Sequence, residues 1–302
     1  MNTNLAILIP VYNALPHTIK CLTLLNSMIK LSAESEIQTI IIDDGSSDGT
    51  EKWIRENFPK TTILKGEGNL WWSGGINVGI KYALRRCRAE YILWWNNDII
   101  PESDYFQNLL LILQNKEVMI GGSKIYYAHQ KNIIWSMGGI FDTKTGKKFM
   151  IGMNEPDGEQ FNKVTEVDWL PGMGTFIHKS VFEKIGLVDD NNFPQYHGDS
   201  DFTFRATLAG YRIQVFPQLK IWNDKSNSGL LHQNNYKLLI RSLKDIKSNY
   251  HLLKDIRFYR RYATSPLAYQ TLAYKYCFYL GGFIKWKFLS LLGQTKKEHY
   301  KI

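Results

Sequence analysis

The first third of the chain alternates short, fully apolar runs with segments of helical periodicity. The apolar runs have the length and the β-branched content of buried strands, and they occupy residues 5–10, 37–42, 61–65 and 91–95. Helical segments lie between them, around residues 18–31, at residues 48–53, and from the glycine-rich stretch 66–79 to Arg88. This order of strands and helices predicts a parallel sheet wound by right-handed crossovers.

The hydrophobic pattern changes after a predicted helix at residues 103–115. Shorter apolar runs bounded by turn residues predict further strands at residues 118–127, 133–141, 149–153, 164–170, 171–177, 211–216 and 220–222. Two more helices are predicted at residues 179–185 and from Asp199 to just before Gly210, and residues 235–292 have the pattern of long helices. We therefore expect an α/β domain over residues 1–231 and a helical extension over residues 232–302.

Charge divides the chain at the same place. From His232 onward fourteen Lys and Arg stand against three acidic residues, so the extension holds the whole basic excess of a chain with net charge +9. A basic, aromatic, amphipathic element suits the surface of an anionic inner membrane, and we expect residues 235–302 to bind there. The alternative is a helical cap that packs on the α/β domain with solvated cations, and the two roles are compatible. No nucleic acid is expected as a partner, because no RNA- or DNA-binding module is recognisable.

Cysteine content and hydropathy indicate the compartment. Cys21, Cys87 and Cys277 are scattered without metal-type spacing, which is typical of reduced thiols in a cytosolic protein. No apolar stretch approaches the ~20 residues of a spanning helix, and the amino terminus lacks the features of a signal peptide. We expect a cytoplasmic protein that is peripheral at the inner face of the cell membrane.

Polar side chains gather where the apolar runs end, which is where open α/β sheets place ligands. They are Asp43, Asp44, Asn96, Asn97 and Asp98, and two further acids, Asp199 and Asp201, open a later helix. A carboxylate flanked by amides suits a hard divalent cation that bridges to phosphate oxygens. Taken singly, each acid is equally compatible with a turn, a strand end or a helix cap. Their order along the chain is more specific than any one of them.

Three segments carry a resemblance to a known family. They are ILIPVYN at residues 7–13, IDDGSSDGT at residues 42–50 and WNND at residues 95–98. Together they resemble the amino-terminal signature of the inverting family-two glycosyltransferases, which have the GT-A nucleotide-diphospho-sugar-binding fold. The resemblance covers residues 5–225 and implies a mostly parallel central sheet flanked by helices. It also implies a nucleotide-binding half at residues 1–116 and an acceptor half at residues 117–231.

The resemblance implies a role for each matched residue. Asp44 matches the carboxylate that accepts a hydrogen bond from a uracil or thymine base, and Asp98 matches the last acid of the family's Asp-any-Asp metal motif. Asp199 is the candidate general base, which must reach the acceptor hydroxyl. Asp201 is a structural or substrate-positioning partner, and Arg205, one helical turn on, is near enough to pair with it. The other residues implied to bind the nucleotide-sugar are Pro10, Tyr12, Asn13, Asp43, Asn69, Trp72, Gly74, Gly75, Asn77, Asn96 and Asn97.

A second group of residues is expected around the acceptor and the donor sugar. It consists of Trp169, Gly172, Gly174, His197 and Asp201. The two glycines can leave room for a ligand, or they can simply form a turn. His197 can hydrogen-bond substrate or metal, although a single loop histidine usually does neither. At least one of Trp71 and Trp72 is expected in the core rather than on a sugar.

The sequence departs from the family pattern at three places. Asn96 and Asn97 replace the first positions of the metal motif, as in a rhamnosyltransferase-like subset, and leave Asp98 as the one certain carboxylate for Mg²⁺ or Mn²⁺. Gly198 replaces the Glu that precedes the base in the family's Glu-Asp-any-Asp segment. The histidine ligand that many members have after the last strand is replaced by residues 222–224, so Asn223 is only a weak candidate ligand.

These observations predict an inverting, metal-dependent glycosyltransferase. The expected donor is a dTDP- or UDP-sugar, with rhamnose as the first candidate, and the expected acceptor is a lipid-linked saccharide of a bacterial surface polysaccharide. A hexose or N-acetylhexosamine transferase of the same fold is the first alternative. The alternative from another class is a non-catalytic sugar-nucleotide-binding protein, because one acid of the metal motif and the histidine are missing.

Overall fold

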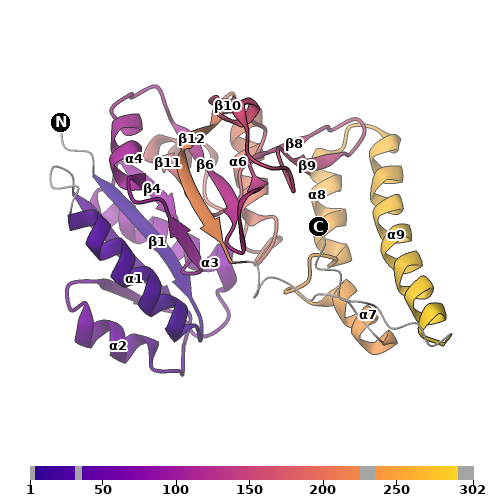
Figure 1. Cartoon of the computed structure of the whole chain (residues 1–302), viewed down its shortest axis with the longest axis horizontal. Coiled ribbons are helices and arrows are strands. Elements are labelled where there is room, and N and C mark those ends of the chain that lie inside the picture. The colour runs from indigo at the N-terminus through magenta and orange to yellow at the C-terminus, as the bar shows by residue number, and fades with distance from the viewer. Residues whose placement is uncertain (1–3, 31–35, 225–234, 292–302) are drawn as a thin grey trace. The chain divides into compact units, whose positions relative to one another are not determined.

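The computed structural model describes residues 4–30, 36–224 and 235–291. The chain forms two compact units, which are described separately. One comprises Met1–Ile140 and Met150–Ser226, and the other comprises Phe141–Phe149 and Asn227–Ile302. Figure 1 shows the sheet of the first unit and the helices of the second.

The first unit is built on the four strands predicted near the amino terminus. They are β1 (Leu5–Val11), β2 (Ile37–Asp43), β3 (Thr62–Lys65) and β4 (Tyr91–Trp94). All pair in parallel, in the order β4-β1-β2-β3. The helices between them are α1 (Leu15–Lys30), α2 (Thr50–Asn57) and α3 (Trp71–Tyr82), which continues into a π turn at Ala83–Cys87. The predicted parallel arrangement is confirmed, and it brings the carboxyl ends of these strands to one edge.

Two apolar cores cover the two faces of this sheet. Side chains of α1, α2 and α4 (Tyr105–Leu113) pack on one face. Side chains of α3, α5 (Lys179–Ile185) and α6 (Gly198–Leu208) pack on the other. The strands between them are apolar on both sides because both sides are buried. The sheet therefore holds the loops at its carboxyl edge on a rigid, two-sided core.

The second half of the sheet is mixed rather than parallel. Its strands are β6 (Ile120–Tyr127), β7 (Gln130–Ser136), β10 (Thr165–Glu166), β11 (Thr175–His178) and β12 (Ile213–Asn223). β11 runs antiparallel between β4 and β6, whereas β12 runs parallel to β6. The strand predicted at residues 133–141 is two strands, because Gly138 turns the chain at φ 76° before β8 (Gly139–Phe141). The two strands predicted at residues 211–222 are one strand with an irregularity after Phe216.

A three-residue strand not expected from the sequence follows the Asn-Asn-Asp turn. It is β5 (Ile99–Pro101), which pairs antiparallel with the end of β12, where Ile99 lies opposite Asn223. Pro101 predicts the end of a strand, and β5 does end at Pro101, after its short pairing with β12. The consequence is that the turn containing Asp98 lies next to the end of β12.

The second unit consists of helices and one β-hairpin. The helices are α7 (Tyr236–Lys244), α8 (Leu252–Tyr262) and α9 (Pro266–Leu291). The hairpin consists of Phe141–Phe149, which joins β8 to β9 (Lys148–Met150). The Tyr259 hydroxyl donates to the Gly146 carbonyl at 2.6 Å, and the Thr271 hydroxyl donates to the Thr145 carbonyl at 2.5 Å. At Gly146 a Cβ would lie 2.8 Å from the backbone of Ala268, so the hairpin belongs to the core of this unit.

The helical prediction for residues 235–291 is confirmed. Its last predicted position, Leu292, and the cations Lys296, Lys297 and Lys301 lie outside the described residues. In the part of the chain that the structure covers, no helix has both the length and the apolar character that crossing a bilayer requires.

Candidate active site

Asp44 organises the glycine-rich loop that precedes α3. Its carboxylate is buried and accepts hydrogen bonds from the backbone N–H groups of Gly68, Leu70 and Trp71 at 2.8, 2.9 and 3.1 Å. At Gly66 a Cβ would lie 2.5 Å from the same carboxylate, so the loop can close around Asp44 only with glycine there. The structure therefore gives Asp44 a role in shaping the loop, and its contact with a base stays a prediction.

The first two sequence motifs form one surface. The Asn13 side-chain oxygen accepts from Ser47 N–H at 2.8 Å, and Asn13 N–H donates to the Ser46 hydroxyl at 2.9 Å. Asp48 accepts from the backbone N–H of Leu15 at 2.8 Å, at the start of α1. Asp43 accepts from Ser46 N–H at 2.9 Å, and Tyr12 beside this turn is 53% exposed.

The small residues of α3 let the helix approach its neighbours. At Gly75 a Cβ would lie 3.3 Å from Pro10, so this glycine sets the contact between α3 and β1. Gly74 faces the loop after α5, whereas Asn69 is exposed before the helix. Asn77 is buried and exchanges hydrogen bonds of 2.8 and 3.0 Å with the backbone of Val188. We assign Asn77 to the scaffold of the site on these contacts.

Four predicted site residues from four separate segments of the chain are joined in one chain of contacts. The Trp72 indole N–H donates to the Asn96 side-chain oxygen at 3.2 Å. The same indole packs on Gly172, where a Cβ would lie 2.2 Å from the ring. Gly172 N–H in turn donates to Asp199 Oδ2 at 2.8 Å. The metal-motif turn, the start of α3, the loop before β11 and the start of α6 therefore meet at one place.

Replacing Gly172 with Ala tests this chain. The added methyl group overlaps the Trp72 ring, so we expect a destabilisation of about 1–3 kcal/mol and a loss of activity larger than the change in stability explains. Thermal unfolding and kcat measured on the same preparation separate the two effects. The control is Gly281→Ala in α9, where nothing lies within 4 Å of the added atom. It should leave kcat unchanged and should not lower stability, because Ala favours a helix interior by up to about 1 kcal/mol over Gly. Trp72→Leu, added to Gly172→Ala, should relieve the overlap. If Gly172→Ala were as stable as the native chain, the packing of Trp72 on Gly172 would be contradicted.

Asp98 has the character of a cation ligand. Its Oδ1 is buried and, among the described residues, has no hydrogen-bond partner. Burial raises the pKa of the Asp98 carboxyl, the side chain of His17 lowers it, and the nearby Asp224 carboxylate raises it. The neighbouring Asn97 side chain donates to the Thr18 hydroxyl at 3.0 Å, which fixes the turn against α1. A buried carboxylate oxygen without a donor is costly unless a cation or a proton joins it.

The pairing of β5 with β12 supplies a second acid at this place. Asn223 is buried opposite Ile99, and Asp224 N–H lies 3.4 Å from the Asp98 carbonyl oxygen. Asp224 is thus the residue near Asp98 that sequence reasoning missed as a ligand, although its place after the last strand is where the family has its histidine. No group of three His, Cys, Asp or Glu suited to a metal occurs in the described ranges. A cation here would need amide, water or phosphate oxygens besides the two carboxylates.

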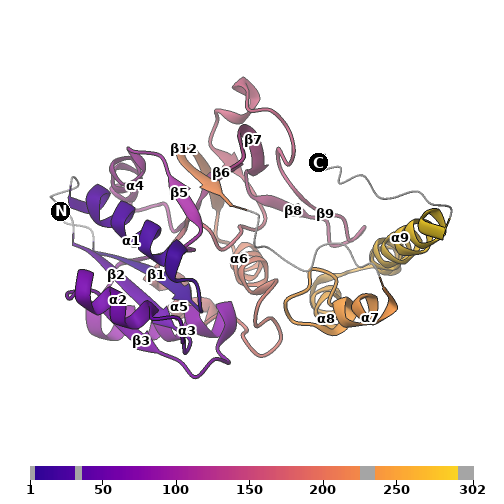
Figure 2. The same cartoon turned by 60° about the horizontal axis from the view of Figure 1, so that its bottom comes forward.

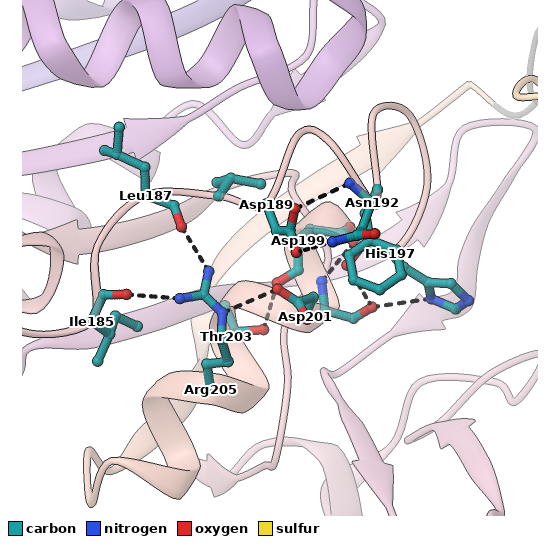
Figure 3. Close-up of polar contacts among 12 residues, drawn as sticks. Ile185, Leu187, Asp189, Asn192, His197, Asp199, Asp201, Thr203 and Arg205 are labelled. Atoms are coloured by element: carbon teal, nitrogen blue, oxygen red, sulfur yellow. Dashed lines mark hydrogen bonds and ion pairs between the residues drawn. The ribbon is translucent and has the colours of Figure 1, made fainter. Parts of the chain in front are cut away.

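The start of α6 places Asp199 at the surface of the site and Asp201 beneath it. Asp199 Oδ1 accepts from Ser200 N–H at 2.7 Å, in addition to the bond from Gly172. His197 adopts a left-handed conformation at φ 70°, and its Nδ1 lies 3.3 Å from the Ser200 hydroxyl. Asp201 is fully buried and pairs with Arg205 at 3.1 Å, as Figure 3 shows. The predicted pairing with Arg205 is confirmed, and Asp201 is part of the scaffold.

The loop between α5 and α6 connects the candidate base to α3. The Arg205 guanidinium donates to the carbonyl oxygens of Ile185 and Leu187, each at 2.7 Å (Figure 3). Farther along the loop, the Phe193 carbonyl accepts from the Ser73 hydroxyl at 2.5 Å. The Gln195 side-chain oxygen accepts from the backbone N–H of Trp72 at 3.2 Å. Sequence reasoning missed Ser73 and Gln195, because no spacing relates residues more than a hundred positions apart.

Two predicted acceptor-pocket residues are packed within the sheet. The indole of Trp169 fills the space beside Gly139, where a Cβ would lie 2.1 Å from the ring. Gly174 has φ 66°, and a Cβ there would lie 2.4 Å from the Ser123 hydroxyl. These contacts place both residues in the scaffold of the first unit.

Comparison with known proteins agrees with this geometry. The family model described as "Glycosyl transferase family 2" matches residues 6–186. The dTDP-rhamnosyl transferase RfbF of Shigella flexneri is 24% identical over 221 residues, which are 73% of this chain and 69% of that protein. The low-salt glycan biosynthesis hexosyltransferase Agl10 of Haloferax volcanii is 26% identical over 175 residues, which are 58% of this chain and 54% of that protein.

Solved structures share the fold at low identity. The mannosyltransferase PcManGT from Pyrobaculum calidifontis, in complex with GDP-Man and Mn²⁺, superposes with a TM-score of 0.56 at 13% identity over 92% of this chain and 70% of that one. GalNAc-T7 with UDP, GalNAc and Mn²⁺ gives 0.59 at 11% identity over 91% of this chain and 57% of that one. This chain thus spans less than two thirds of GalNAc-T7 and of Agl10. The predicted GT-A fold is confirmed.

Proposed function

The chain belongs to glycosyl transferase family 2, and from this membership we propose that it transfers a sugar from a dTDP- or UDP-sugar to a saccharide acceptor with inversion. Rhamnose is the first candidate for the sugar, because a relative carries the name dTDP-rhamnosyl transferase. A hexose is the second candidate, because the other relative is named a hexosyltransferase. The observation that carries the proposal is the chain of contacts from Asn96 through Trp72 and Gly172 to Asp199.

The proposed chemistry is one displacement with Asp199 as general base. The acceptor hydroxyl gives its proton to the Asp199 carboxylate while its oxygen bonds to the anomeric carbon, and the bond from that carbon to the nucleoside diphosphate breaks on the opposite face. Hydrogen bonds from Gly172 and Ser200 hold the carboxylate in one orientation. This orientation keeps the base ready for the hydroxyl.

We propose that Asp98 and Asp224 hold Mg²⁺ or Mn²⁺ together with the donor diphosphate. The buried Oδ1 of Asp98 and the second acid beside it fit a hard divalent cation. When bound, the cation supplies Lewis-acid stabilisation of the leaving diphosphate. Mn²⁺ occurs in two of the similar structures, which supports this choice of ion.

Metal binding can be tested without any turnover. Mn²⁺ at a hundred times its dissociation constant should stabilise the native chain by about 2.7 kcal/mol, since it binds the folded state only. Thermal unfolding with Mn²⁺, Mg²⁺ and EDTA measures this effect. Asp98→Asn should abolish it and Asp224→Asn should reduce it, whereas Asp190→Asn in the loop after α5 should leave it intact. Equal stabilisation of the Asp98 variant and the native chain would remove Asp98 as a ligand.

A donor panel tests the reaction itself. Purified protein is given dTDP-rhamnose, UDP-glucose and UDP-N-acetylglucosamine with Mn²⁺, and release of nucleoside diphosphate is measured. Release from dTDP-rhamnose alone supports the rhamnosyl assignment, whereas release from UDP-sugars alone favours the hexosyl or N-acetylhexosaminyl alternative. The anomeric configuration of a product, read by NMR, decides whether the reaction inverts. No release from any donor, with binding retained, would favour the non-catalytic alternative.

We further propose that the acceptor is a lipid-linked saccharide of a surface polysaccharide such as lipopolysaccharide or capsule, and that the protein works at the inner face of the cell membrane. The support is the charge of the described helices α7 to α9. Residues 235–291 contain eleven Lys and Arg against Asp245 and Asp255 alone.

A further inference from the structure

Helix α9 has a packed face and an uncovered apolar face. Ala268, Leu272, Tyr276 and Phe283 are buried on the packed face, and α7 and α8 lie on one side of the helix in both views (Figures 1 and 2). Six apolar side chains elsewhere on the helix are 49–83% exposed. They are Leu267, Tyr274, Phe278, Ile284, Phe288 and Leu291, and we call them the outer face of α9. Exposed apolar side chains that gather on one element in this way mark an interaction site.

The charge of the surrounding surface restricts what can cover this face. From Ile256 to Lys297 the sequence contains no acidic residue. Lys275 is paired with Asp255, and Lys287 lies over the Tyr236 ring of α7. Lys285 is exposed on the same helix as the outer face. A second copy of the chain would bring a strongly cationic surface against another, and like charges oppose that contact. An anionic surface with an apolar interior satisfies both the lysines and the apolar side chains.

The length and composition of α9 fit a helix that lies in a membrane interface. Its 26 residues give a rod of about 39 Å. Aromatic rings and lysines along its length are the side chains found at the boundary between lipid headgroups and acyl chains. Lys285 lies among the apolar residues near the carboxyl end, so the helix is suited to lie along a bilayer rather than to pass through it.

We propose that the outer face of α9 inserts into the headgroup region of an anionic phospholipid bilayer. This proposal deepens the proposed function. It rests on that function only for the purpose of membrane binding, which would bring the protein to a lipid-linked acceptor. The binding itself depends on the exposed apolar residues and on the exposed Lys285. Both contributions are needed, because a single interfacial element binds weakly with either one alone.

Cys277 on α9 offers a direct reporter of insertion. It is exposed, whereas Cys21 is buried, so a Cys87→Ser variant can be labelled at Cys277 with an environment-sensitive fluorophore. Vesicles of phosphatidylcholine with phosphatidylglycerol should shift its emission to the blue, and phosphatidylcholine alone should not. Point variants are preferred to removal of the helix, because the hairpin at residues 141–149 would lose its partners.

Vesicle co-sedimentation of unlabelled variants measures each contribution. Phe278→Ser with Ile284→Ser should weaken binding at least tenfold, since two apolar side chains leave the bilayer. Lys285→Gln should weaken it about fivefold at low salt, since one lysine near an anionic surface contributes about 1 kcal/mol. The controls are Leu111→Ser and Leu208→Ser, which lie at 63% exposure like Ile284 but in the other unit, and they should not change binding.

Three outcomes would overturn the proposal. In the first, the serine variants bind vesicles as tightly as the native chain, which would indicate charge attraction without insertion. The second is a concentration-dependent dimer that the serine variants disrupt, which would make the outer face a contact between copies. The third is an equal loss with the Leu111 and Leu208 controls. Donor turnover measured without vesicles is independent of all three, so a failure of membrane binding and a failure of the proposed reaction can be told apart.

Discussion

Replacing Asp199 with Asn is expected to lower kcat about a thousandfold, within the range that a positioned general base contributes. The amide keeps the size of the side chain and one oxygen that can accept from Gly172 or Ser200, but it cannot take the proton of the acceptor hydroxyl. The affinity for the nucleoside diphosphate should stay unchanged, because we propose that the diphosphate binds at Asp98 and Asp224 and not at Asp199. Initial rates with donor and acceptor, and calorimetric titration with the diphosphate, measure the two quantities.

The matched control for this variant is Asp189→Asn. Asp189 is an acid of the preceding loop, and it accepts from Asn192 within that loop at 3.1 and 2.8 Å. Its replacement should leave kcat close to that of the native chain. If Asp199→Asn kept full activity, or if both variants lost activity equally, Asp199 would not be the base. The pH dependence of the residual activity gives a further check, because loss of the base should remove the acidic limb of kcat/KM.

Replacing Arg205 with Met should destabilise the protein by about 3–5 kcal/mol, the cost of breaking a buried ion pair from one side. Asp201 is fully buried and loses its charge partner, and the carbonyl groups of Ile185 and Leu187 lose their donor. Thermal and urea unfolding measure the change. We also expect kcat to fall at near-constant KM for the donor, because the pair anchors the first turn of α6, from which Asp199 projects.

Two variants separate the buried pair from charge in general. Arg212→Met removes an arginine from its pair with Glu166, where the two side chains are 71% and 56% exposed, and it should cost at most about 1 kcal/mol. Asp201→Asn combined with Arg205→Met should recover part of the stability, since no unpaired buried charge remains. Equal effects of the Arg205 and Arg212 variants would show that burial of the pair contributes nothing.

The parts of the fold that follow from local pattern could be predicted from the sequence. The four parallel strands are apolar on both faces because both faces are buried, and this leaves a clear signal. The pairing of Asp201 with Arg205 follows from helical spacing alone. Asp44 and Asp98 could be located because polar residues end apolar runs, and Asp199 because acids open a predicted helix. The resemblance to the family then gave these positions chemical roles.

The parts that depend on contacts between distant residues could not be predicted in this way. β5 has three residues and exists because β12 offers it a partner, so only the paired structure brings Asp224 to Asp98. The resemblance to the family implies that Asn77 binds the donor, whereas the structure packs Asn77 in the scaffold. Its contact with Val188, 111 residues away, gives no sequence signal. Gly172 was compatible with a turn or with ligand space, and only the position of Trp72 explains why the site requires glycine there.

The hairpin at residues 141–149 has a consequence for how the protein is made. Its partners in α8 and α9 follow it by more than a hundred residues, as the 113-residue separation of Gly146 and Tyr259 shows. During synthesis the first unit can therefore begin to fold while this hairpin has no partner, and the hairpin can be completed only after the last helices leave the ribosome. A nascent chain that stalls before α9 would lack the helix on which Thr145 and Gly146 pack. Maturation of the catalytic unit and of the C-terminal unit is thereby ordered in time.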